Sequence, residues 1–315
     1  MRIVPQPTTA RRVFAFWWLA AGAAARMAPS GRVDPAIHCC AGILAGATST
    51  TLLFPLDLVK VLFQADTSLA RLPGVAAMSV RVARAEGFRA LFQGLTPALV
   101  GSTVSWGGFF YVYERLKPPG RATSTADALV ASVQAGAAMV LLTNPFWLVK
   151  TRLQLQTKSH GTAAYDGFAD CLRRVVRDEG WAALYRGLVP ALLLTSHGGV
   201  QFACYEQLKR LRPPSGHSQY EAPVYGALSK LAASVATYPY QVVKTRVQDR
   251  AAAAGGSELA RTLACVGDTW RRERVRGFFR GCWANSVRVM PSAAITFWIY
   301  ELVVAHAGGR APAGP

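Results

Sequence analysis

Apolar residues occur in long runs along this chain, and isolated polar or basic residues interrupt most of them. Helix-length runs follow one another at about 36–63, 94–116, 125–155, 187–210, 222–249 and 282–306. None supplies the ~20 uninterrupted apolar residues of a simple helix surrounded by lipid. Ser, Thr, Asn, Gln, His and single Lys or Arg residues recur within them, as is typical of helices with one face toward lipid and another toward water. The pattern predicts an all-α membrane protein whose helices enclose a pore or a cavity.

Three sequence elements recur three times in the same order, about 93 residues apart. The first is FPLDLVKVLFQ, NPFWLVKTRLQ and YPYQVVKTRVQ, with prolines Pro55, Pro145 and Pro239. The second is EGFRALFQG, EGWAALYRG and ERVRGFFRG, and the third is YERLK, YEQLK and YELVV. Such periodicity is the mark of a repeated structural unit. Each unit is predicted to contain a long helix, a loop with a short amphipathic helix, and a second long helix.

The repeats divide the chain into five parts. We expect an N-terminal extension at 1–34, repeats at 35–118, 119–212 and 213–308, and a C-terminal tail at 309–315. The extension is rich in Arg and contains the apolar block VFAFWWLAAGAAA, which fits an organelle-targeting segment or an unstructured tail with an adhesive patch equally well. Arg-rich segments ending in VRVARAEG, LRRVVRDEG and TWRRERVRG fit helices lying in the membrane interface.

Composition and charge narrow the function classes. The chain has 35 Lys and Arg residues against 17 Asp and Glu, a formal charge of +18 that suits nucleic acid, anionic lipid or an anionic solute. The basic residues are spread between apolar runs instead of forming a tail, which disfavours nucleic acid. The six cysteines lack C-x-x-C spacing, and no metal-ligand, Ser-His-Asp, G-x-G-x-x-G or P-loop pattern stands out. Neither an enzyme nor a metal protein is expected.

The repeated P-x-[DE]-x-x-[KR]-x-[KR]-x-Q element, with the two elements that follow it, resembles the signature of the mitochondrial carrier (solute carrier 25) family over about residues 36–306. The resemblance implies six transmembrane helices in three pseudo-symmetric repeats around a central cavity, with short amphipathic helices on the matrix side. It also implies a monomeric transporter of the mitochondrial inner membrane, with cardiolipin as a bound lipid and no cofactor. A plastid envelope is the less favoured location.

Two sets of residues match the gates of that family. The matrix gate would comprise Pro55, Asp57, Lys60, Gln64, Pro145, Lys150, Gln154, Pro239, Gln241, Lys244 and Gln248. The cytoplasmic gate would comprise Tyr113, Glu114, Lys117, Tyr205, Glu206, Lys209, Tyr300 and Glu301. Trp147 and Gln241 occupy two of the three acidic positions of the matrix gate, so the resemblance implies one ion pair, Asp57–Lys150, and two cations without acidic partners. Leu62 replaces the second base that Arg152 and Arg246 supply in the other repeats.

Trp147 points to the kind of substrate. A flat ring beside Lys150 and Arg152 suits an aromatic group attached to an anion, and the alternative is a bulky plug in the gate. The P-x-W element resembles carriers of folate, FAD, NAD and pyrimidine nucleotides, and segments such as LTSHGGVQFACYE and RVMPSAAITFWIYE resemble the folate/FAD branch. The expected substrate contacts are Trp147, Lys150, Arg152, Arg288, Lys60, Lys244, Leu194 and His197.

Two of these residues have structural alternatives. Arg288 is a lone cation in an apolar helix, which is costly unless it meets an anion, water or backbone carbonyls. His197 fits a packing role as well as a ligand contact. The expected function is transport of folate or FAD. An NAD or pyrimidine nucleotide carrier of the same fold and a carrier-like adaptor or ion-leak protein are the alternatives.

Overall fold

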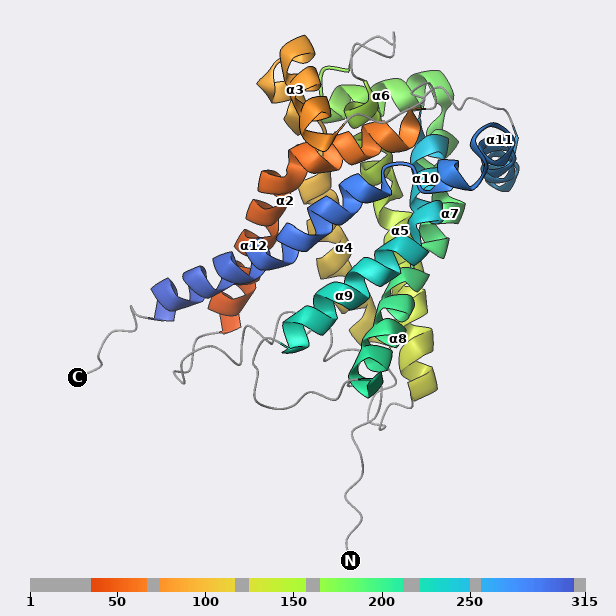
Figure 1. The fold of residues 1–315 in the computed structure, drawn as a ribbon. Coiled ribbons are helices and arrows are strands. Elements are labelled where there is room, and N and C mark those ends of the chain that lie inside the picture. Colours follow the sequence, from red (N-terminus) through yellow and green to blue (C-terminus); the bar gives the residue numbers. More distant parts are fainter. Residues whose placement is uncertain are drawn as a thin grey trace, which may run out of the picture.

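The computed structural model describes residues 35–66, 74–116, 125–156, 165–211, 221–249 and 256–308, and all regular secondary structure within these ranges is helical (Figure 1). The first repeat contains α2 (Pro35–Ala65), α3 (Val75–Glu86), the 3-10 helix η1 (Phe88–Phe92) and α4 (Leu95–Leu116). The second contains α5 (Thr125–Leu155), α6 (Phe168–Glu179), η3 (Trp181–Tyr185), α7 (Leu188–Leu193) and α8 (Ser196–Leu211). The third contains α9 (Glu221–Ala236), α10 (Tyr238–Gln248), α11 (Glu258–Phe278) and α12 (Cys282–Gly308).

Two of the expected long helices are divided. The run at 222–249 breaks into α9 and α10 at Thr237, just before Pro239, whose ring nitrogen has no hydrogen to donate. The run at 187–210 breaks between α7 and α8, where the hydroxyls of Thr195 and Ser196 each donate to a backbone carbonyl at 2.7 Å. Hydroxyls that bond locally in this way compete with the helical backbone pattern. Pro55 and Pro145 instead lie within the continuous helices α2 and α5.

The helices pack in an order that closes on itself. The strongest helix pairings between repeats are α4 with α5, α8 with α9, and α12 with α2, so the last repeat packs along the first (Figure 1). At one end, segments 55–64 of α2, 145–154 of α5 and 239–248 of α10 come together, and α2, α5 and α10 contact one another. We call this the convergent end. The amphipathic helices α3, α6 and α11 lie at the same end in Figure 1.

Glycines at the start of the second helix of each repeat allow close contact between repeats. Gly94, Gly187 and Gly281 have φ between 77° and 87°. A Cβ on Gly187 would lie 2.9 Å from Cγ of Gln248 in the third repeat, and one on Gly281 would lie 3.0 Å from Cβ of Phe63 in the first. The first contact is too close for a side chain, and the second would require Phe63 to shift. Each loop therefore packs against the convergent-end helix of the next repeat.

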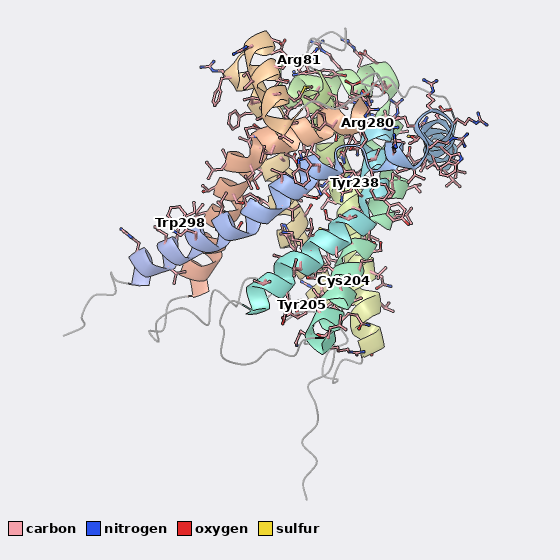
Figure 2. All side chains as sticks on the ribbon, viewed as in Figure 1. Arg81, Cys204, Tyr205, Tyr238, Arg280 and Trp298 are labelled. Carbon is pink, nitrogen blue, oxygen red and sulfur yellow. The ribbon has the colours of Figure 1, made fainter. Side chains whose placement is uncertain are left out.

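Composition alone identifies two membrane-crossing candidates among the described residues, Ala41–Ala65 and Val130–Leu155. The segment Val224–Ala236 is apolar but shorter. Large apolar side chains are exposed along several other helices, including Tyr111 on α4 and Trp298, which is 65% exposed on α12 (Figure 2). Exposed apolar side chains on several helices are expected where lipid covers a protein.

Arg274 has a backbone conformation that favours glycine. Its φ is 55° and its ψ is −150°, and the matching positions in the other repeats are Gly87 (φ 90°) and Gly180 (φ 81°). Non-glycine residues in this region carry about 1–3 kcal/mol of strain. The sequence already contained the signal, because ERVRG replaces the E-G of EGFRALFQG and EGWAALYRG.

Replacing Arg274 by Gly is expected to raise the free energy of unfolding by about 1 kcal/mol. Relief of the strain outweighs the ~0.5–1 kcal/mol of extra unfolded-state entropy that glycine brings. Thermal unfolding of the purified protein in detergent measures the change. Gly180→Ala is the matched control and should lower stability. An unchanged Tm for Arg274→Gly would contradict a strained backbone at this position.

Candidate substrate site and gate

One ion pair joins α2 to α5 at the convergent end. Asp57 follows Pro55 by two residues and Lys150 follows Pro145 by five, and Lys150 Nζ lies 2.6 Å from Asp57 Oδ2. Their side chains are 13% and 15% exposed. Gln154 Nε2 donates to the same carboxylate oxygen at 3.2 Å. The predicted Asp57–Lys150 pair is confirmed, with Gln154 bracing it.

The other two lysines have neutral partners. Lys60 Nζ donates to Gln241 Oε1 at 2.9 Å, which joins α2 to α10. Lys244 Nζ lies 5.6 Å from the centroid of the Trp147 ring, which joins α10 to α5. These are the two positions at which Gln and Trp replace an acid. The hydrogen bond and the cation–π contact take the places of two ion pairs, so all three helix pairs remain connected.

Two ammonium groups lie over the Trp147 ring. Lys150 Nζ is 5.4 Å from the ring centroid, close to the 5.6 Å of Lys244. The indole Nε1 donates to Thr143 Oγ1 at 3.2 Å, which fixes the ring one helical turn along α5. A cation over an aromatic face contributes ~0.5–2 kcal/mol, depending on desolvation. Such a contact leaves the charge of Lys244 available to an anion, whereas Lys150 is also paired with Asp57 at 2.6 Å.

A layer of neutral hydrogen bonds supports these three links. Gln64 Nε2 donates to Tyr238 OH at 3.0 Å, and Gln64 Oε1 accepts from Thr245 Oγ1 at 2.8 Å. Gln248 Oε1 accepts from Thr151 Oγ1 at 2.9 Å. Tyr238 OH in turn donates to the Arg280 carbonyl at 3.0 Å, and the two residues lie together where α10 meets the start of α12 (Figure 2). Tyr238 is not among the residues predicted from the sequence, although its place directly before a repeated proline was a usable signal.

Arg152 was predicted to contact substrate, but it lies in a buried ion-pair cluster instead. Its side chain is 1% exposed, its guanidinium forms a bidentate pair with Glu179, and its Nε donates to the Gln248 carbonyl at 3.3 Å. Glu179 also pairs with Arg186. The third repeat has the same triad, in which Glu273 pairs with Arg246 at 2.7 Å and with Arg280 at 2.9 Å. Because the same triad occurs in two repeats, we assign Arg152 a structural role and do not propose it as a substrate contact.

Arg288 reaches the convergent end from α12. Its Nε lies 3.6 Å from Asp57 Oδ1, and one terminal nitrogen donates to Asn285 Oδ1 at 3.3 Å. Asp57 therefore lies between Lys150 and Arg288. The structure brings Arg288 together with Trp147, Lys150, Lys244 and Lys60 at one end of the bundle, as a common anion site would require.

His197 and Leu194 come from the α7–α8 unit, which supplies none of the cations around Trp147. The His197 Nδ1 atom is hydrogen-bonded to Thr237 Oγ1 at 2.9 Å, at the break between α9 and α10. This contact favours the packing role for His197. Leu194 is half-buried at the break between α7 and α8. Neither residue is needed to form the group of cations around Trp147.

The predicted cytoplasmic-gate residues on the described parts of α4 and α8 lie at the opposite end of the bundle. Tyr113 is buried on α4, and Tyr205 lies near the free end of α8 (Figure 2). Glu206 and Lys209 form a 4.0 Å pair within α8 itself. Lys117 lies outside the described residues, as do the side chains of Tyr300 and Glu301. The arrangement of this second gate stays a prediction.

The fold and the repeated gate elements define a membrane carrier. A profile of the family described as "Mitochondrial carrier protein" matches residues 31–118, 121–216 and 215–310 in succession. The chain belongs to the mitochondrial carrier family, whose members are transporters and not enzymes. It therefore carries a small-molecule substrate.

Relatives within the family transport different molecules according to their names. The chain is 40% identical to "Folate transporter 1, chloroplastic" of Arabidopsis thaliana, over 84% of this chain and 93% of that protein. It is 31% identical to "Nicotinamide adenine dinucleotide transporter 2, mitochondrial" of the same plant, over 84% and 77%. It is 34% identical to "Mitochondrial nicotinamide adenine dinucleotide transporter 1" of Saccharomyces cerevisiae, over 82% and 74%.

Proposed function

We propose that this carrier transports a flat, anionic heteroaromatic metabolite, folate or FAD, by alternating access. The observation that carries the proposal is the Trp147 ring, which stands at an acidic position of the gate and contacts both Lys150 and Lys244. A ring in this place can stack on a pterin or a flavin, and the cations around it can meet the carboxylates or phosphates. The 40% identity to a folate transporter supports the same substrate class.

The proposal includes six transmembrane helices around a water-filled central cavity. They would be α2, α4, α5, the α7–α8 unit, the α9–α10 unit and α12, with α3, α6 and α11 in the matrix-side interface, where cardiolipin would bind. The links at the convergent end support a state closed on the matrix side. In Figure 1, α2 and α12 lead away from α5 and α8 toward the other end, which would face the cytosol. The proposed location is the mitochondrial inner membrane, and the proposed state is a monomer.

Substrate binding would drive the transition by competing for the gate. A ring stacked on Trp147 displaces at least one lysine from its face, and an anionic group attracts Arg288 away from Asp57. The three links then weaken together. A ligand shifts such an equilibrium only by its preference for one state over the other, so substrate must bind best once the links are loosened. This gate has one ion pair, one hydrogen bond and one cation–π contact. Opening it therefore requires less binding free energy from the substrate than opening a gate with three ion pairs.

NAD is the second candidate substrate. Relatives 31% and 34% identical to this chain carry nicotinamide adenine dinucleotide in their names, and NAD also joins flat rings to an anionic diphosphate. The Trp147 site does not separate the two classes by itself, since each offers a ring and a negative charge.

A ligand screen tests the proposal. Folic acid, tetrahydrofolate, FAD, FMN, NAD, CTP and UTP are added singly to the purified carrier, and thermal unfolding is followed. A ligand that binds the folded state at 100 times its Kd stabilises it by about 2.7 kcal/mol. We expect folates or FAD to give the largest rise in Tm. Stabilisation by NAD or by CTP and UTP alone would support the rival carriers, and stabilisation by no compound would support the adaptor or ion-leak alternative.

A further inference from the structure

Lys230 is a cation in the middle of an apolar helix. It is not among the site residues predicted from the sequence. It lies within the apolar stretch Val224–Ala236 of α9 and is half-buried. Among the described residues no carboxylate lies within salt-bridge distance of its ammonium group. A lysine inside a membrane helix is expensive and is kept where it lines a substrate path or pairs with another group. The sequence contained a signal for this residue, because Lys230 is the single charged residue of GALSKLAASVA.

A hydrogen bond between α9 and α12 places Lys230 opposite Arg288. Asn285 Nδ2 donates to Ser234 Oγ at 2.8 Å, and both residues are buried. Lys230 precedes Ser234 by four residues and therefore shares its face of α9. Arg288 follows Asn285 by three residues on α12 and donates to it at 3.3 Å. The two cations therefore lie one turn from the same interhelix contact.

Both cations lie on the same side of that contact. The two helices run antiparallel there, because α9 leads toward the convergent end and α12 leads away from it (Figure 1). Lys230 precedes Ser234 on α9, and Arg288 follows Asn285 on α12. Because the helices are antiparallel, both residues lie farther from the gate than the Ser234–Asn285 hydrogen bond.

Arg288 retains donor capacity toward this space. Its Nε is buried and makes no hydrogen bond in the structure, and its contact with Asp57 is a loose 3.6 Å. A buried guanidinium nitrogen without an acceptor costs free energy that an incoming anion can recover. Two neighbouring cations, one with an unused buried donor, are what a doubly charged anion would neutralise.

We propose that Lys230 and Arg288 form a subsite for the doubly anionic part of the substrate, one helical turn beyond the gate. This inference rests on the proposed function and adds a division of labour to it. Trp147 would take the aromatic ring, and the Lys230–Arg288 subsite would take the two negative charges. These charges would be the diphosphate of FAD or the glutamate carboxylates of a folate.

Uptake by reconstituted liposomes tests this division. For whichever of FAD or folic acid the wild type transports, Lys230→Gln should raise KM roughly tenfold to a hundredfold, the loss expected for one charge-assisted hydrogen bond. Lys230→Arg should restore KM to within about threefold, because the charge is kept. Riboflavin and pteroic acid keep the rings but lack the diphosphate and the glutamate, respectively. Their inhibition of uptake should be equal in wild type and Lys230→Gln.

Two results of the uptake assay would overturn the subsite. One is an unchanged KM in Lys230→Gln. The other is an equal loss of riboflavin or pteroic acid inhibition, which would indicate a general disturbance of the site.

If the wild type takes up neither FAD nor folic acid, the proposed function fails. A binding measurement then tests the subsite independently. Inorganic pyrophosphate and L-glutamate are then added separately to purified protein, and Tm is measured. The subsite predicts that at least one dianion stabilises wild type and Lys230→Arg but not Lys230→Gln. Arg177→Gln, on the exposed face of α6, is the control for general charge and should behave as wild type. Equal stabilisation of all variants, or of none, would overturn the subsite.

Discussion

Asp57→Asn is expected to reduce uptake about a hundredfold and to lower the free energy of unfolding by about 3 kcal/mol. The Asp57 carboxylate is the acceptor for Lys150 at 2.6 Å and Gln154 at 3.2 Å, and it lies 3.6 Å from Arg288. An amide in its place leaves two cations near each other without an anion. Removing one partner of a buried pair costs ~3–5 kcal/mol, and the partial exposure of this pair places it at the low end. A 3 kcal/mol shift against the closed gate corresponds to about a hundredfold in its population.

Thermal unfolding and liposome uptake measure the two effects of Asp57→Asn. Asp170→Asn is the matched control, because Asp170 pairs with Arg174 at 2.9 Å on α6, where both side chains are about 30% exposed and such a pair contributes ~0–1 kcal/mol. Adding Lys150→Gln to Asp57→Asn should recover part of the lost stability, since it removes an unpaired cation. A variant Asp57→Asn with wild-type uptake would show that the ion pair does not form the gate.

Trp147→Ala is expected to raise KM for the cognate aromatic anion about tenfold or more while lowering Tm by only a few degrees. The ring contacts two lysines at 5.4 and 5.6 Å, and ring stacking and cation attraction each contribute ~0.5–2 kcal/mol in partly desolvated settings. Trp147→Phe should retain most of the uptake, because a flat face remains. Trp181→Ala, which changes an exposed indole on η3, should leave KM unchanged.

Trp147→Glu separates stacking from gating. Glutamate restores the acid that the family pattern has at this position and can form an ion pair with Lys244. If Trp147 serves only as a gate partner or plug, this variant should keep both stability and uptake. The stacking role predicts a different result, in which Tm is preserved and uptake of the aromatic anion is lost. Retained uptake with an unchanged KM would count against a substrate contact at Trp147.

Much of this architecture could be predicted because it is encoded in local, repeated signals. The prolines Pro55, Pro145 and Pro239, with charged and amide residues at fixed offsets, mark the three segments that meet at the convergent end. The Asp57–Lys150 pair was implied by the resemblance to the carrier family. The amphipathic helices followed from their Arg-rich faces.

Other features depend on contacts between repeats and could not be predicted from local pattern. The sequence left Lys244 and Lys60 without acidic partners, and only the packing of α2, α5 and α10 shows that Trp147 and Gln241 contact them. Arg152 looked like a substrate contact because it lies two residues from Lys150. A helix turns about 200° over two residues, so the two side chains face opposite ways, and Glu179 at the end of α6 pairs with Arg152.

The helix breaks were also hidden in the sequence. Pro145 and Pro239 occupy the same repeat position, yet α5 continues through one and the chain breaks before the other. The residues preceding the two prolines are Asn144, which donates to the Leu184 carbonyl at 2.8 Å, and Tyr238, which is fully buried against Gln64 and Arg280. Tertiary contacts of this kind decide whether a proline bends a helix or divides it.

Uptake of radiolabelled folic acid and FAD into liposomes containing the wild-type carrier tests the central claim most directly. The account predicts saturable uptake of at least one of them, inhibited by the matching ring compound and reduced in Trp147→Glu to the level of empty liposomes. NAD, CTP and UTP should compete weakly. Uptake of NAD or of a pyrimidine nucleotide with no uptake of folic acid or FAD, or full folate or FAD transport by Trp147→Glu, would contradict it.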